Sequence, residues 1–261
     1  MPTSLKIVAG ALSLGCLAQV AVDGGVCSAS SPPHPTALPS VYYVPARSLP
    51  HDRGFAVVGS VPQLRHAGSH EAALNEHLRS VVEQAIRQAE RSVRPTSGRF
   101  AGGGEFGIMP VRSLIFANSV LFSALLPAVE SRPHGTSAPY WLSVTMEASS
   151  PRSTVGISGV ITAAGFGLLA KSLRSRLEKN RCVTQWASSR ALASATAPKA
   201  TSFRQFALLP AGLAVGFPAS PSSPMYECAS FYVIPYSELA GAMSPAGKAL
   251  AKAAAVGRAS G

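Results

Sequence analysis

The chain has 261 residues, a formal net charge of +11 and only 13% charged residues. Its length suits one sizeable domain or two small intertwined halves, and 47% hydrophobic residues are enough for a buried core. The basic balance favours anionic partners such as envelope polymers, lipid head groups, acidic proteins or nucleic acid, without choosing among them. The carboxylates are few and scattered, which argues against the paired acids of a glycosidase.

The first 29 residues are predicted to be a signal peptide. Lys6 precedes the apolar run Ile7–Val22, which is shorter than the roughly 20 residues that a membrane-spanning helix needs. Small residues follow, and cleavage is expected between Ala21 and Ser30; an uncleaved anchor is the alternative. Cys16 stands in an imperfect lipoprotein-like context, so anchoring there is not expected. We therefore expect a secreted, extracellular protein.

Residues 30–50 are rich in Pro and Ser and are predicted to be an extended linker. A strand is expected over Phe55–Leu64, broken at Pro62. Ser69 then caps a predicted amphipathic helix that Pro95 ends, because apolar residues recur at spacings of three and four. They are Leu74, Leu78, Val81, Val82, Ala85 and Ala89.

The stretch Gly102–Gly107 contains a literal G-x-G-x-x-G, but a polar stretch precedes it and Met-Pro follows, so a loop is expected. Strands are predicted in Ser113–Glu130 and Pro139–Ala148, joined as a hairpin with an exposed loop. In the second strand, Trp141, Ser143 and Thr145 alternate with the apolar Leu142, Val144 and Met146, so the two sets should lie on opposite faces.

A second helix is expected after Thr162, with Leu169, Leu173 and Leu177 on its apolar side. Its other face is basic, through Lys171, Arg174, Arg176 and Lys179. A weaker helix is predicted within residues 185–196. Two short strands then follow at residues 213–217 and 231–234. At Pro235 the second strand must end or lie at a sheet edge, and Ser237 can cap a short helix. The Ala-rich tail, residues 244–261, is expected to be a loose helix or disordered.

Cys182 and Cys228 remain after the leader. In an oxidising compartment such a pair favours a disulfide over a metal site, and two free buried thiols are the alternative.

The carboxyl end resembles the RsiV-type extracellular domain, domain of unknown function 3298. The family's Gly-Leu turn, aromatic-ended strand, loop Tyr and Ile-Pro-Tyr-Ser segment fall on Gly212, Leu213, Phe217, Tyr226, Ile234, Pro235, Tyr236, Ser237 and Leu239. A Gly-Gly-Ala-His-Gly loop of the family survives only as His134 and Gly135. Residues 147–162 depart from the family pattern.

The resemblance covers most of residues 55–243, and in layout the chain most resembles the mycobacterial secreted immunogenic protein group. It implies one compact α+β unit of two layers, a curved antiparallel sheet with helices packed on one face. Residues 51–243 would form this domain, with halves at about 51–148 and 149–243. The family's known activities are mainly recognition, because RsiV-type domains bind lysozyme, and no catalysis is established for the immunogenic members.

An enzymatic site would have to use Asp52 or a Glu beside a His, and His134 near Glu130 is the one candidate centre. His66, His70 and His77 lie near one another without a further ligand at helical spacing, so no metal and no cofactor are expected. We thus expect no catalytic residue and a non-enzymatic recognition protein; a hydrolase or esterase centred on His134 is the alternative.

The expected binding residues are His134, Gly135, Tyr226 and Tyr236. The expected partner is a lysozyme-like or host protein, or an anionic envelope polymer. Nucleic acid is not expected, and membrane contact would come only from an uncleaved leader or from surface charge.

Overall fold

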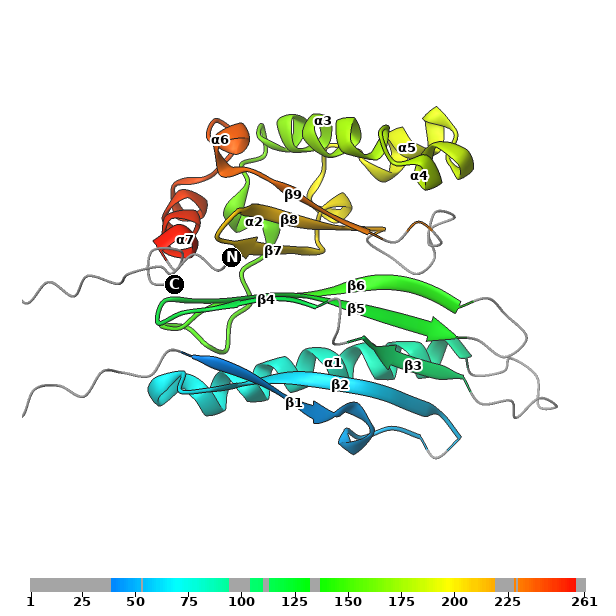
Figure 1. The fold of residues 1–261 in the computed structure, drawn as a ribbon, viewed down its shortest axis with the longest axis vertical. Helices are drawn as coiled ribbons and strands as arrows, with labels where there is room; N and C mark the ends of the chain where they lie inside the picture. The colour runs from blue at the N-terminus through cyan, green and yellow to red at the C-terminus, as the bar shows by residue number, and fades with distance from the viewer. Residues whose placement is uncertain are drawn as a thin grey trace, which may run out of the picture. The chain divides into compact units, whose positions relative to one another are not determined.

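The computed structural model describes residues 39–256, apart from 53, 94–103, 110–112, 132–136, 219–227 and 229. Their strands form two sheets, one of six strands and one of three, with helices packed on them (Figure 1). The expected α+β class is confirmed, and the expected curved sheet is divided into two. All of these residues lie in a compact unit that spans Ala37–Gly261.

In the larger sheet the strands pair in the order β1-β2-β3-β5. Strand β5 pairs with β3 and then β4 along one edge and with β6 along the other. The pairs of this sheet are antiparallel except for β2 and β3, which run parallel. A parallel pair needs a crossover connection, and helix α1 occupies that connection. The elements are β1 (Ser40–Pro45), β2 (Ala56–Arg65), α1 (Glu71–Val93), β3 (Glu105–Ile108), β4 (Leu114–Ala117), β5 (Leu121–Ser131) and β6 (Ser137–Glu147).

Helix α1 confirms the predicted amphipathic helix, but Ser69 is not its cap. Gly68–His70 form a turn of 3-10 helix, and α1 begins at Glu71. The Glu71 carboxylate instead reaches back to accept a hydrogen bond from the Ala67 backbone N–H at 3.3 Å. The apolar stripe is buried against the larger sheet as expected, through Leu74, Leu78, Val82, Ala85, Ile86 and Ala89.

Strands β5 and β6 are buried on both faces, and this explains their almost continuous apolar sequence. Phe122 and Val144 belong to the core under α1, whereas Leu125 and Trp141 pack against the smaller sheet. The alternation predicted along residues 141–146 is therefore confirmed. Both faces of β6 are covered, one by the core under α1 and the other by the smaller sheet.

The smaller sheet consists of β7 (Phe206–Leu209), β8 (Gly212–Phe217) and β9 (Ser230–Ile234). The two predicted strands are confirmed as β8 and β9, which pair antiparallel with Leu213 opposite Ile234. Gly212 has φ of +149°, and a Cβ on it would lie 2.3 Å from the Ile234 carbonyl oxygen. The turn into β8 therefore requires a glycine.

Two side chains of the larger sheet form hydrogen bonds with the edge of β7 that does not pair with β8. The Leu208 backbone N–H donates to Ser123 Oγ at 2.8 Å, and Ser143 Oγ donates to the Phe206 carbonyl at 2.5 Å. Exposed strand edges invite pairing with other chains, and these two hydroxyls satisfy backbone groups that β8 does not reach. The same contacts fix one sheet on the other.

The remaining helices belong to the second half of the chain. As predicted, Leu169, Leu173 and Leu177 of α3 are buried. Residues 245–256 of the predicted tail form a helix that packs on the core through Leu250 and Ala254. The helices are α2 (Ile157–Val160), α3 (Phe166–Leu177), α4 (Arg181–Trp186), α5 (Ser189–Ala195), α6 (Tyr236–Leu239) and α7 (Pro245–Val256).

Besides the Ser69 cap, four further local predictions are wrong. Part of the expected linker forms β1, where the β-branched and aromatic run Val41–Val44 pairs with β2. Residues 105–107 of the G-x-G-x-x-G stretch lie in β3 and not in a loop. Pro62 lies inside β2, opposite Tyr43. Ser237 lies within α6, whose N-cap is Pro235.

The predicted strand over residues 113–130 is two strands, β4 and β5, that form a hairpin. Asn118 explains the break. Its Oδ1 accepts hydrogen bonds from the backbone N–H groups of Val120 and Leu121, at 2.9 and 2.8 Å. An Asn side chain that bonds its own backbone two residues on is typical of a turn.

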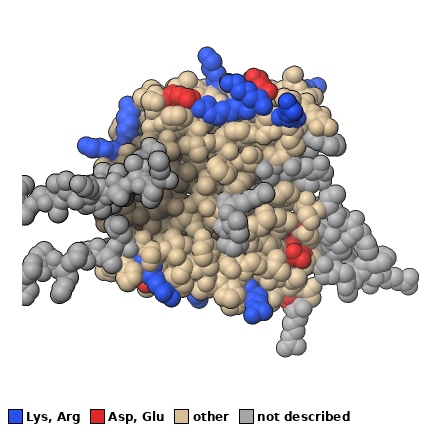
Figure 2. Space-filling model, in the orientation of Figure 1, with Lys and Arg blue, Asp and Glu red and all other residues tan. Residues whose placement is uncertain are grey.

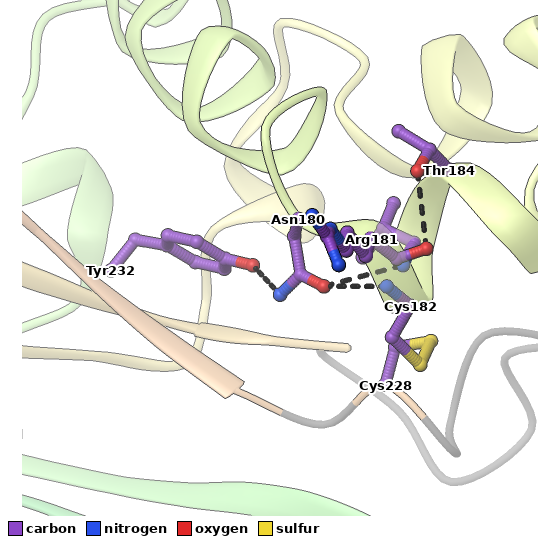
Figure 3. Close-up of a disulfide and its surroundings, with 7 residues drawn as sticks. Asn180, Arg181, Cys182, Thr184, Cys228 and Tyr232 are labelled. Atoms are coloured by element: carbon purple, nitrogen blue, oxygen red, sulfur yellow. Dashed lines mark hydrogen bonds between the residues drawn. A yellow bond between two sulfur atoms is a disulfide. The ribbon is translucent and has the colours of Figure 1, made fainter.

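The predicted Cys182–Cys228 disulfide is present, with a Cα–Cα distance of 5.6 Å (Figure 3). It joins the start of α4 to the segment before β9. Asn180 caps α4 at the same place, because its Oδ1 accepts from the backbone N–H of Cys182 at 3.0 Å. Its Nδ2 donates to the Tyr232 hydroxyl at 2.7 Å.

Replacing Asn180 with alanine should lower the free energy of unfolding by about 1–2 kcal/mol, since it removes a helix cap and the bond to Tyr232. Denaturant unfolding measures the change. Asn180→Asp keeps the capping acceptor and loses the donor, so it should lie between wild type and Asn180→Ala. Equal stability of all three proteins would contradict the assigned role of Asn180.

Candidate binding surface

Of the four predicted binding residues, only Tyr236 lies among the described residues; His134, Gly135 and Tyr226 lie outside them. Tyr236 is half-buried, and its hydroxyl donates to the Leu209 carbonyl at 2.9 Å. Burial raises the pKa of this phenol well above its ordinary value, although the bond to Leu209 acts in the opposite direction. Tyr236 thus ties the end of β9 to the β7–β8 turn, and its hydroxyl has a structural partner.

Replacing Tyr236 with phenylalanine should lower the free energy of unfolding by about 1 kcal/mol, because the Leu209 carbonyl loses its donor. Chemical denaturation measures this. Tyr43→Phe is the matched control, because Tyr43 is 46% exposed and its hydroxyl should contribute nothing. If both changes have the same effect, the Tyr236 bond does not stabilise the fold.

The positive charge of the protein is concentrated in its second half. From residue 149 onward the sequence has 12 Lys and Arg against 3 Asp and Glu, whereas residues 37–148 have 10 against 8. Lys and Arg side chains gather at the end of the molecule where α3–α5 lie (Figure 2). We call this the basic surface; its members are Lys171, Arg174, Arg176, Lys179, Arg181, Arg190 and Lys199.

Within the described part of the chain, Arg176 is the only member of the basic surface with an ion pair. Its Nη2 lies 2.8 Å from Glu238 Oε1, and the hydrogen bond from Arg176 lowers the pKa of the Glu238 carboxyl. The other six residues have no carboxylate partner among the described residues. Their charges are therefore available to a ligand.

Arg174 is held by a hydroxyl group and not by a carboxylate. Its Nε and Nη2 each donate to Thr196 Oγ1 at 3.1 Å, and the buried Thr196 hydroxyl donates in turn to the Leu192 carbonyl. Next to Arg174 lies an open cavity of about 380 Å³ between α3 and Pro198. The basic face of α3 was predicted; the cavity was not, because Pro198, which lines its other side, is 24 residues away from Arg174.

A second open cavity, of about 470 Å³, lies at the carboxyl end of α1 and is lined by Pro50, His51, Asp52, Arg87, Glu90 and Arg91. It contains Asp52, which the sequence indicates, together with any Glu, as a possible acid of a triad. His51 Nδ1, however, lies 2.7 Å from the Leu49 carbonyl oxygen, and Glu90 Oε1 accepts from the Asp52 backbone N–H at 2.7 Å. These ring and carboxylate atoms are engaged with the backbone, and the cavity mixes both signs of charge.

Among the described residues, no group of three or more His, Cys, Asp or Glu could hold a metal ion. His77, one of the three histidines considered above, instead has its Nε2 within 2.5 Å of Thr154 Oγ1. Nor does this part of the chain contain a helix with the length and apolar character needed to cross a membrane.

Two solved structures of DUF3298-family proteins are similar to this chain. The one from Bacteroides fragilis has a TM-score of 0.47 and 15% sequence identity, and the match covers 80% of this chain and 94% of that one. The one from Pseudomonas aeruginosa PAO1 has a TM-score of 0.44 and 12% identity, and covers 82% of this chain and 96% of that one. No protein-family model matches the chain, and neither does any curated protein.

Both neighbours carry the family name of the resemblance described above. Neither is named as an RsiV protein or as a mycobacterial one, so placement in either group stays a prediction.

Proposed function

We propose that this protein is a secreted, non-enzymatic recognition protein that binds an anionic polymer of the cell envelope. The observation that carries the proposal is the basic surface on α3–α5, where six of seven cationic side chains lack a carboxylate partner among the described residues. An excess of unpaired charge of one sign attracts ligands of the other sign and accelerates their association.

A polymer suits this surface better than a small ion. Helix α3 has 12 residues and is therefore about 18 Å long. Lys171 and Arg174 lie along it, Lys179 follows just after its end, and Arg181 lies at the start of α4. An exposed ion pair contributes only about 0.2–1 kcal/mol, so useful affinity needs several pairs formed together. A chain of repeating anions can form them.

The predicted leader would bring the protein to the compartment where such polymers occur. The disulfide supports the same location, because disulfides persist in oxidising compartments. The resemblance to recognition domains agrees with a binding role. The alternative ligand for the same surface is an acidic protein.

The proposal is tested by titrating the full chain with poly(glycerol phosphate), with neutral dextran as the control and with an acidic protein in a third arm. We expect saturable binding to the phosphate polymer, weakening as ionic strength rises from about 0.05 to 0.5 M because salt screens exposed charges. No binding at low salt, or equal binding to dextran, would overturn it. Stronger binding to the acidic protein would redirect it to a protein partner.

A further inference from the structure

The cavity beside α3 has charges of both signs around an open, uncharged floor. Gly167 and Ala170 of α3 form the floor, and Pro198 closes the opposite side. Lys171 and Arg174 of α3 also line the cavity, as does Glu178, the C-cap of the helix, about one turn beyond Arg174. A Cβ on Gly167 would meet nothing within 4 Å, so the floor is open at that position.

The carboxylate of Glu178 does not form an ion pair with Arg174, the neighbouring cation of this cavity. Arg174 of α3 and Glu178, the C-cap of that helix, are four residues apart, where a pair could form, yet no ion pair within 4.0 Å joins them. Thr196 holds the Arg174 guanidinium instead, at 3.1 Å. The Glu178 carboxylate is exposed and has no partner among the described residues.

We propose that this cavity binds a single unit of the polymer that carries both an anionic group and an ammonium group. This rests on the proposed function and specifies its ligand. Lys171 and Arg174 receive the phosphate or carboxylate, and Glu178 receives the ammonium. At 1.5 Å of rise per residue, Arg174 and Glu178 are about 6 Å apart along the helix axis, which sets the spacing between the two groups of the ligand.

A volume of 380 Å³ is at the small end of ligand sites and suits one such unit. On a surface that selects only anions, Glu178 would repel the ligand. A ligand that also carries an ammonium turns that repulsion into a charge-assisted hydrogen bond.

The test compares two small probes, glycerophosphoethanolamine and glycerol phosphate, on wild type and Glu178→Gln. We expect the variant to bind glycerophosphoethanolamine about tenfold more weakly, through loss of the charged contact. Glycerol phosphate should bind equally or up to about threefold more strongly, because a repulsive charge is gone. Glu76→Gln, at an exposed position on α1, is the control and should change neither affinity.

A second variant tests the location without altering charge. Gly167→Leu fills the floor of the cavity and should reduce binding of glycerophosphoethanolamine by about tenfold or more, with no loss of fold, since nothing stands within 4 Å of the new Cβ. Ala255→Leu adds the same side chain at an exposed site on α7 and should leave binding unchanged.

The outcomes separate this inference from the proposed function. If Glu178→Gln strengthens binding of both probes while the phosphate polymer still binds, the inference is overturned and the proposed function stands. If neither probe nor polymer binds wild type, both are overturned. Binding to phosphatidylethanolamine vesicles in preference to an amine-bearing phosphate polymer would overturn the polymer as the source of the unit.

Discussion

Replacing Trp141 with alanine is expected to lower the free energy of unfolding by about 4 kcal/mol. Trp141 is 4% exposed and lies between the two sheets. Its ring packs edge-on against Phe231, with ring centroids 5.7 Å apart, and its indole N–H points to the Phe217 carbonyl at 3.4 Å. Alanine would remove these contacts and leave a cavity that the sheets cannot close without moving.

Gly216 provides the internal control for Trp141. A Cβ on Gly216 would lie 2.6 Å from the indole ring, so Gly216→Ala should destabilise the wild-type protein. In a Trp141→Gly background, which also removes the Trp141 Cβ that would lie 2.7 Å from the new methyl group, that methyl group has room, and the same change should be neutral or stabilising. Denaturant unfolding of the four proteins measures this coupling. Additive effects would contradict close packing of Trp141 on Gly216.

Removing the disulfide is the other change with a large expected effect. Cys182 and Cys228 are 46 residues apart, and in the loop-entropy model closing such a loop stabilises the fold by about 4 kcal/mol. The loop contains α4, α5, β7 and β8, so its release frees the connection between the basic surface and the smaller sheet. We expect Cys182→Ala/Cys228→Ala to unfold at a much lower denaturant concentration.

Reduction of the wild-type protein gives an independent measure of the same bond. A reductant should lower the unfolding midpoint of wild type to that of Cys182→Ala/Cys228→Ala and should not affect the double variant. A wild-type midpoint that does not respond to reduction, with the thiols shown to be free, would mean that the bond contributes nothing to stability.

The parts of the fold that depend on local pattern could be predicted from the sequence. The period of Leu74, Leu78 and Val82 identified α1, and the alternation around Trp141 identified both faces of β6. The division into two sheets could not be predicted. The contacts between the two sheets include a hydrogen bond from the Leu208 backbone N–H to the Ser123 hydroxyl, 85 residues away in the sequence, and no local pattern predicts such a contact.

Prediction of the candidate site from the sequence has the same limit. The basic face of α3 follows from helical spacing, and the sequence revealed it. Tyr236 was expected to bind a partner, whereas its hydroxyl is held by Leu209, 27 residues away. The cavity beside Arg174 is completed by Pro198, 24 residues further along the chain, and the availability of Glu178 depends on Thr196 holding Arg174. These are tertiary contacts between elements that are not adjacent in the sequence.

The most direct test of the account measures polymer affinity in two double variants that carry the same change of charge. Lys171→Glu/Lys179→Glu alters the basic surface, and Lys248→Glu/Lys252→Glu alters exposed positions on α7. If the basic surface is the binding site, the first pair should weaken binding of poly(glycerol phosphate) at least tenfold more than the second. Equal losses in the two variants would show that net charge alone attracts the polymer, and would contradict a binding site on α3–α5.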